Sequence, residues 1–195
     1  MNFLAHLHIA HHCRSSLLGN LLGDFVKGDP SRDYTPEIAA GIRLHRFVDS
    51  YTDSAVIMQR AKQFFPQGPR RYSGIALDVF WDHCLATHWA RYHAQPLDLF
   101  CQRSETIVKE TSVTHLPERF ALVSENMWRG RWLESYRDLE NIEFALKRMS
   151  ERRSTMAPLT QCYPYLQRHY DDLQQLFAEF YPKLLLASQD FSAEN

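Results

Sequence analysis

The chain has 195 residues, of which 45% are hydrophobic and 13% aromatic, and its formal net charge is −1 at pH 7. This length and composition exclude a disordered chain, the near-neutral charge argues against a nucleic-acid or membrane partner, and no apolar run reaches the roughly 20 residues that cross a bilayer. The four cysteines are scattered without a C-x-x-C pair, so we expect a reduced, cytoplasmic protein. The length of the chain predicts a single domain over residues 1–195.

Helix signals follow one another along almost the whole chain. Ser15 and Ser16 can cap the first predicted helix, and Thr35-Pro36-Glu37 combines an N-cap, a proline at the first helical position and an acidic first turn. The predicted helices lie near residues 15–28, 35–51, 53–66, 71–95, 97–111, 117–128, 132–152 and 162–188, with a kink at Pro182 and a frayed end at 192–195. Strand alternation and repeats are absent from the sequence, so we predict an all-α fold, a compact single-domain bundle of seven to nine helices.

Three polar pairs at a spacing of four residues interrupt these otherwise apolar helices. They are Asn20/Asp24, His45/Asp49 and Asp78/Asp82, and His83 follows directly in the run Trp81-Asp82-His83-Cys84-Leu85. Residues four apart share one helix face, and a single such pair is more often a solvated face than a site. A buried carboxylate, however, costs several kcal/mol unless it is paired or bound to a metal. Three pairs within the first 85 residues, each with an aspartate, therefore favour a site.

The mixture of histidine and aspartate indicates a hard or borderline divalent ion. Mn²⁺, Mg²⁺ and Fe²⁺ suit these ligands, and Zn²⁺ is a further candidate. H-E-x-x-H, Glu-x-x-His, P-loop, G-x-G-x-x-G and G-x-S-x-G motifs are all missing from the sequence. A thiol hydrolase using Cys84 beside His83 is disfavoured, because adjacent helical residues point roughly 100° apart. Helical His/Asp metal sites suit phosphate-ester hydrolysis, with a neighbouring aspartate or histidine taking the proton of water.

Four segments, residues 1–8, 19–26, 41–46 and 77–83, resemble the acyl carrier protein phosphodiesterase family, also called the acyl carrier protein hydrolyase family. The resemblance implies an all-helical enzyme related to the HD-domain phosphohydrolases and dependent on Mn²⁺, with Mg²⁺ or Fe²⁺ as alternatives. Its substrate would be holo-acyl carrier protein, and a water activated by the metal would release 4′-phosphopantetheine and the apo-carrier. The order Asp24, His45, Asp82-His83 reverses the usual His-Asp dyad, which implies a permuted or divergent HD arrangement.

The resemblance also implies roles for single residues. The expected metal ligands are Asp24, His45, Asp82 and His83. Catalytic or water-orienting roles fall to Asp24 and to the residues one turn from each ligand, Asn20, Asp49 and Asp78. For His6 we keep two readings, a ligand or proton donor to the leaving serine oxygen, and a packed or surface histidine.

The acidic carrier substrate calls for a basic docking surface. The candidates for docking or for phosphate binding are Arg43, Arg46, Arg70 and Arg71, since arginine makes bidentate contacts with phosphate. The basic cluster Lys147, Arg148, Arg152 and Arg153 reads as an ordinary solvated helix end.

Two alternative functions remain open from the sequence. The first is an HD-type phosphohydrolase acting on a nucleotide such as guanosine tetraphosphate, which would share the chemistry but not the docking surface. The second is a non-enzymatic helical interaction module whose polar pairs are structural. Competition by the apo-carrier or by a nucleotide distinguishes the two enzymes, and loss of metal binding in Asp24→Ala or Asp82→Ala distinguishes both from the module.

Overall fold

The computed structural model describes residues 1–152 and 154–194, so Arg153 of the basic cluster and Asn195 of the expected frayed end lie outside it. The described residues are helical without any strand, which confirms the all-α prediction. The α-helices are α1 (Phe3–His12), α2 (Leu17–Leu22), α3 (Pro36–Ser54), α4 (Val56–Lys62), α5 (Ser73–Thr87), α6 (Leu97–Glu110), α7 (Glu118–Arg129), α8 (Trp132–Ser135), α9 (Leu139–Ser150), α10 (Tyr163–Arg168) and α11 (Tyr170–Glu194). Four 3₁₀ helices connect them: η1 (Pro30–Arg32), η2 (Pro69–Tyr72), η3 (Trp89–Arg91) and η4 (Ser154–Cys162).

The number of helices differs from the seven to nine expected, because the described residues form eleven α-helices. Residues 3–12 form a helix that the caps did not predict, and the expected helices at 132–152 and 162–188 are each divided by a short break, at 136–138 and at His169. The helix predicted near 53–66 does not begin at Asp53, because Asp53 and Ser54 continue α3. Pro182 lies inside α11, which continues to Glu194. Short breaks need no proline or glycine, so the sequence pattern does not reveal them.

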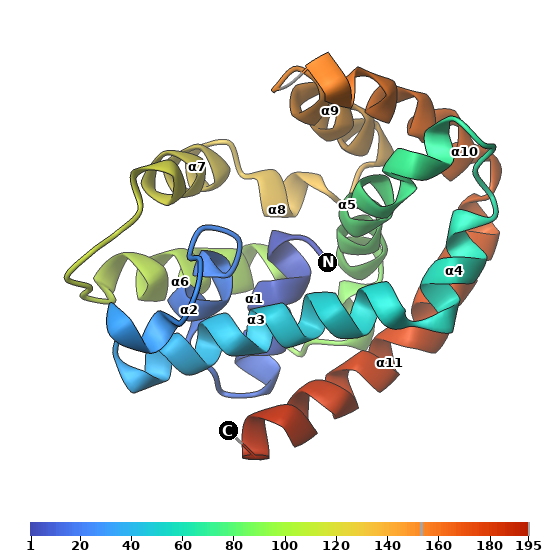
Figure 1. The fold of residues 1–195 in the computed structure, drawn as a ribbon. Coiled ribbons are helices and arrows are strands. Elements are labelled where there is room, and N and C mark those ends of the chain that lie inside the picture. The colour runs from blue at the N-terminus through green and yellow to red at the C-terminus, as the bar shows by residue number, and fades with distance from the viewer. Residues whose placement is uncertain (153, 195) are drawn as a thin grey trace.

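Helix α1 lies at the centre of the molecule. It contacts α2, α3, α5 and α11, and the long helix α3 crosses beside it while α11 runs along α3 (Figure 1). Helix α5 packs against α1 and α9, so it separates the N-terminal helices from the α9–η4 part. Because α1 and α5 both run through the interior, side chains near their facing ends come from residues far apart in the sequence.

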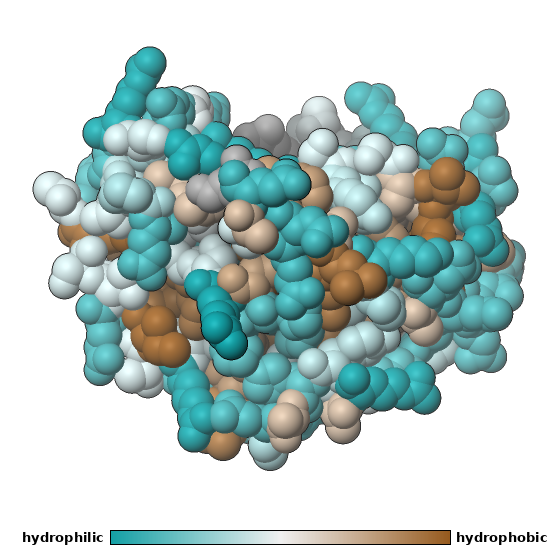
Figure 2. All heavy atoms as spheres, turned by 90° about the horizontal axis from the view of Figure 1, so that it is seen from below, coloured by the Kyte–Doolittle hydropathy of each residue, from teal (hydrophilic) through white to brown (hydrophobic). Residues whose placement is uncertain are grey.

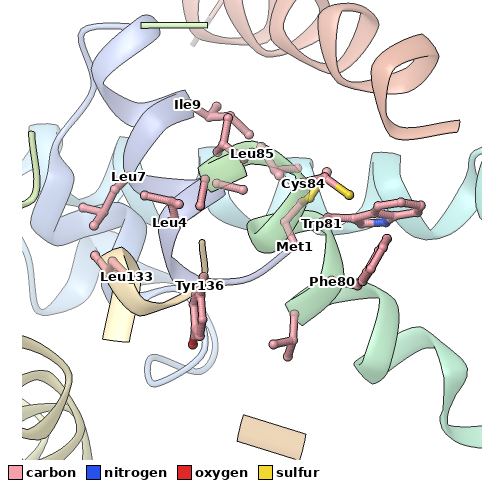
Figure 3. Close-up of a cluster of buried hydrophobic side chains, with 14 of the residues drawn as sticks. Met1, Leu4, Leu7, Ile9, Phe80, Trp81, Cys84, Leu85, Leu133 and Tyr136 are labelled. Atoms are coloured by element: carbon pink, nitrogen blue, oxygen red, sulfur yellow. The ribbon is translucent and has the colours of Figure 1, made fainter. Parts of the chain in front are cut away.

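Most of α5 is apolar and buried in the core. Phe80, Trp81 and Leu85 are fully buried, as expected for core residues, and lie with Leu4 and Leu7 of α1 (Figure 3). A helix with apolar side chains on most of its surface belongs in the interior. The face shown in Figure 2 is mostly hydrophilic, with hydrophobic side chains in small separate groups. Among the described helices we find none that is long and apolar enough to span a membrane.

Helices α2 and α3 approach each other at two glycines. A Cβ on Gly19 would lie 2.4 Å from the carbonyl oxygen of Ile38, and one on Gly41 would lie 2.9 Å from that of Ser16. Only glycine allows backbones to come this close. The approach brings the carbonyl oxygen of Asn20 to 2.7 Å from Nδ1 of His45. The packing of two helices thus orients a histidine ring.

Because His8 of α1 is buried, we expect the protein to lose stability in acid. Its Nδ1 accepts from the hydroxyl of Tyr181 at 2.8 Å and its Nε2 donates to the carbonyl of Tyr92 at 3.1 Å, a pattern that needs the neutral ring. Burial lowers the pKa of His8 to about 3, whereas an unfolded histidine titrates near pH 6.5. Below pH 6.5 the His8 imidazole is therefore protonated in the unfolded chain but not in the folded protein, and the free energy of unfolding falls. Between pH 7 and pH 5 this costs about 2 kcal/mol.

His8→Gln should remove that pH-dependent part of the unfolding free energy. Urea unfolding at pH 7, 6 and 5 measures it, and the exposed His12→Gln on the same helix is the matched control. If the wild type and His8→Gln lose stability in parallel as the pH falls, His8 does not carry this effect.

Candidate metal centre

Two buried histidines and one aspartate meet between α1 and α3. The rings of His6 and His45 stack with their centroids 3.7 Å apart and their planes at 15°. Asp49 bridges them, with Oδ1 at 3.1 Å from Nε2 of His6 and Oδ2 at 3.1 Å from Nε2 of His45. One ligand atom from each residue lies within 4.8 Å of the others, an arrangement that can hold a metal ion. We call these three residues the His–His–Asp group.

The tautomer of His45 leaves Nε2 with a lone pair. Nδ1 donates to the carbonyl oxygen of Asn20, so Nε2 carries no proton in the neutral ring. This buried nitrogen is close to the carboxylates of Asp49 and Asp24, but the directions of these contacts do not make a hydrogen bond. The ring also needs Gly23, because a Cβ there would lie 2.1 Å from Cγ of His45. A fixed tautomer with a free lone pair is the usual state of a metal-ligating histidine.

Asp24 adds a carboxylate from the turn that follows α2. Its Oδ1 lies 3.5 Å from Nε2 of His45, and its side chain is 64% exposed. Arg46 holds the rest of this turn by donating to the carbonyl oxygens of Gly28 and Val26, each at 2.7 Å. Gly28 has a φ of +74°, which permits the bend. The arginine expected to dock the substrate therefore supports the segment that carries Asp24.

The charges of the group depend on one another. Burial lowers the pKa of His45, but the carboxylates of Asp24 and Asp49 outweigh it and raise that pKa to about 9. Burial and the neighbouring His45 lower the pKa of His6 to about 4. Burial would raise the pKa of Asp49, but its close contacts with His45 and His6 hold it well below the usual range. Near neutral pH one proton therefore occupies the place between His45 and the carboxylates, where a cation can replace it.

A cavity of about 190 Å³ adjoins the group, sharing Asp24 and Asp49 with it. Its lining residues are Met1, Asn2, Asp24, Asp49, Asp53, Ile75, Asp78, Val79 and Met149. The α-amino group of Met1 lies 2.8 Å from Oδ1 of Asp78 and 3.4 Å from Oδ1 of Asp49. Burial raises the pKa of Asp78 in spite of this amine. The His–His–Asp group thus opens into a small acidic cavity.

The structure places Asp82 and His83 outside the His–His–Asp group. Asp82 is fully buried, and its two oxygens accept from the backbone N–H groups of Leu4 and Ala5 at 2.8 and 3.0 Å. Nδ1 of His83 donates to the carbonyl oxygen of Tyr136 and Nε2 accepts from the hydroxyl of Tyr170, both at 2.8 Å. In this structure these ligand atoms are hydrogen-bonded elsewhere, so neither residue contributes an atom to the His–His–Asp group.

The other predicted residues fall into two classes. Asn20, Asp49 and Asp78 lie at the group or its cavity, and His6 joins the group rather than the surface. Arg43 bonds to Ser31 and lies 3.5 Å from Asp29, and Arg70 donates through Nε to the carbonyl oxygen of Phe65. Arg71 is exposed beside Tyr72. None of these three arginines lines the cavity.

The sequence patterns missed several lining residues. Asp53 continues the four-residue series of His45 and Asp49 along α3, so a longer reading of that series would have found it. Asn2, whose Nδ2 donates to the hydroxyl of Tyr136, and Met149 of α9 reach the cavity only through tertiary packing. Nothing local in the sequence marks them.

Comparison with known proteins gives a consistent picture. A family model described as acyl carrier protein phosphodiesterase matches residues 1–184. A curated relative named acyl carrier protein phosphodiesterase from Pectobacterium atrosepticum is 45% identical over 186 residues, covering 95% of this chain and 96% of the relative. Relatives of the same name from Yersinia pestis and Klebsiella pneumoniae are 43% and 40% identical, each covering 97% of this chain and 98% of the relative. No solved structure matches the chain.

Proposed function

Because the chain belongs to the acyl carrier protein phosphodiesterase family, we propose that it hydrolyses holo-acyl carrier protein to the apo-carrier and 4′-phosphopantetheine. The observation that carries this proposal is the His–His–Asp group beside a cavity in a chain of this family. The bond to be broken is the phosphodiester between the carrier serine and the phosphopantetheine arm. We also propose a cytoplasmic location, since all four cysteines are free thiols and three of them are buried.

We propose that the group holds a divalent ion, Mn²⁺ in the first place and Mg²⁺ or Fe²⁺ as alternatives. The proposed ligands are His6, His45 and Asp49, with Asp24 as the fourth. The buried Nε2 of His45 has no hydrogen-bond partner, which supports this fit, and two imidazoles with carboxylates suit such ions. When bound, the ion would lower the pKa of a water molecule and offset the charge of the phosphate.

The remaining residues of the site act on protons and charge. Asp78 faces the cavity with a raised pKa, so it is placed to exchange a proton with a water or a leaving oxygen there. Asn20 fixes the tautomer of His45 through its carbonyl oxygen. Arg43, Arg70 and Arg71 remain proposed contacts for the acidic carrier outside the cavity.

The proposal is tested by incubating the purified protein with holo-acyl carrier protein and Mn²⁺ and following the mass of the carrier. We expect the carrier to lose the mass of phosphopantetheine and the apo-carrier to compete for the enzyme. If the carrier mass is unchanged while guanosine tetraphosphate is hydrolysed, the proposal fails in favour of the nucleotide hydrolase. If neither substrate reacts and no Mn²⁺ binds, the helical interaction module is the better account.

Arg46→Lys provides a prediction about the turn that carries Asp24. Lysine keeps the positive charge but cannot donate to both carbonyl oxygens with the planar geometry of the guanidinium. We expect the affinity for Mn²⁺ to fall about 10-fold, as for other residues that orient ligands. Titration with Mn²⁺ monitored by electron paramagnetic resonance measures it, with Arg60→Lys on α4 as the control. An unchanged affinity with a raised KM for the carrier would return Arg46 to a docking role.

A further inference from the structure

The cavity beside the His–His–Asp group has an apolar wall that phosphodiester hydrolysis does not explain. Ile75 and Val79 lie one turn apart on α5 and so share a face, and Met149 of α9 completes the wall. Val79 is buried in the core, whereas Ile75 and Met149 pack against the core but are only half-buried, so part of each side chain stays accessible. Apolar side chains that line a cavity next to a few polar groups are typical of a ligand-binding site.

The chemistry of the apolar wall indicates which part of a phosphate ester can bind against it. Phosphate oxygens need cations or hydrogen-bond donors, and aliphatic side chains supply neither. An ester whose carbon skeleton is branched and apolar next to the phosphate would fill the wall and leave the phosphate at the ionic side. In the phosphopantetheine arm, the second carbon from the phosphate oxygen carries two methyl groups. On the other side of the diester, the carrier serine offers a single methylene group.

We propose that Ile75, Val79 and Met149 form a subsite for the dimethyl-bearing carbon of the phosphopantetheine arm, an inference that rests on the proposed function. The cavity is too small for the whole arm, since its volume of about 190 Å³ is below the roughly 300 Å³ and more that whole drug-sized ligands need. The subsite therefore takes the part of the arm next to the phosphate. It determines specificity by favouring a branched alcohol and by placing the phosphate toward the side of the cavity where Asp24 and Asp49 would hold the proposed ion.

Two small phosphate monoesters isolate this contact. Neopentyl phosphate has the branched carbon and ethyl phosphate lacks it, while their phosphate groups are alike. As inhibitors of the wild-type enzyme with Mn²⁺, we expect neopentyl phosphate to bind about 10-fold more tightly than ethyl phosphate, the discrimination that an added apolar group gives. In the double variant Ile75→Ala/Met149→Ala the ratio should fall to about 2-fold, and the KM for holo-carrier should rise about 10-fold.

Control variants separate the subsite from a structural effect. Ile107→Ala removes a half-exposed isoleucine from α6 and should keep the wild-type ratio. Met149→Leu, which retains an apolar side chain, should also keep most of it. A ratio near one in the wild type, or an unchanged ratio in the double variant, would overturn the subsite. If the wild-type enzyme does not remove phosphopantetheine from holo-acyl carrier protein, the proposed function fails instead. The inhibitor ratio and the carrier mass therefore test the subsite and the function separately.

Discussion

Asp49→Asn is expected to abolish Mn²⁺-dependent hydrolysis, with turnover falling by about 100-fold or more. Asp49 is the residue that both histidines share, since its two oxygens each lie 3.1 Å from one Nε2. Asparagine has the same shape but carries no negative charge, and its NH₂ group replaces one of the two oxygens. Replacing a residue that merely orients a ligand already costs about 10–100-fold in metal affinity, so loss of Asp49, a proposed ligand, should cost at least as much.

The same substitution should change the charge of His45. The carboxylates of Asp49 and Asp24 together hold the pKa of His45 at about 9, so without the charge of Asp49 that pKa should fall toward its ordinary value. Two-dimensional NMR of the imidazole nitrogens follows this shift in the metal-free protein. The fall in turnover and the fall in the pKa of His45 should therefore occur together.

The matched control is Asp190→Asn, which removes one exposed carboxylate from α11. Its turnover, its Mn²⁺ affinity and the pKa of His45 should equal those of the wild type. Normal Mn²⁺ affinity in Asp49→Asn, with the fold intact by circular dichroism, would show that the ion binds elsewhere.

The fold class could be predicted from sequence because its signals are local. Thr35 caps α3 through a hydrogen bond from the backbone N–H of Ile38, and Ser16 caps α2 in the same way through Gly19. These caps depend on neighbours within four residues, which the sequence displays directly. The helix at Phe3–His12 has no such side-chain cap, since its first N–H groups are satisfied by Asp82 of another helix. It was therefore missed.

From the sequence, only those site residues that lie on the same helix could be grouped together. The spacing of His45 and Asp49 does place both side chains at the group, and the same rule applied to Asp53 reaches the cavity. His6 joins them because α1 packs against α3, a tertiary contact with no trace in local spacing. The adjacent Asp82 and His83 looked like ligands because burial of a carboxylate needs compensation. Compensation by backbone N–H groups satisfies the same requirement, and the sequence does not distinguish it from a metal.

The second large effect concerns Asp82, where a helix-capping role and a metal-ligand role predict different results. Asp82 is fully buried, and burial raises its pKa to about 7 even though Leu4 and Ala5 donate to its oxygens. Asp82→Ala would leave two buried N–H groups without acceptors at the start of α1. Each unsatisfied group costs about 1–3 kcal/mol, so the metal-free protein should lose about 3 kcal/mol of stability or more. For a chain of this size the midpoint of thermal unfolding should fall by roughly 6–12 °C.

Thermal unfolding in the presence of a chelator decides between the two roles, because a metal ligand is not needed for stability when no metal is bound. A buried metal-ligand carboxylate would give the opposite sign, since its removal relieves desolvation and repulsion in the metal-free protein. Asp138→Ala, which makes no side-chain cap to α9, is a control that should unfold near the wild-type temperature. If Asp82→Ala unfolds at the wild-type temperature in chelator but no longer binds Mn²⁺, Asp82 is a ligand after all. We expect instead that Asp82→Ala is destabilised in chelator. The lost cap at the start of α1 would then also displace His6, which follows Ala5 in that helix, and the affinity for Mn²⁺ would fall for that reason.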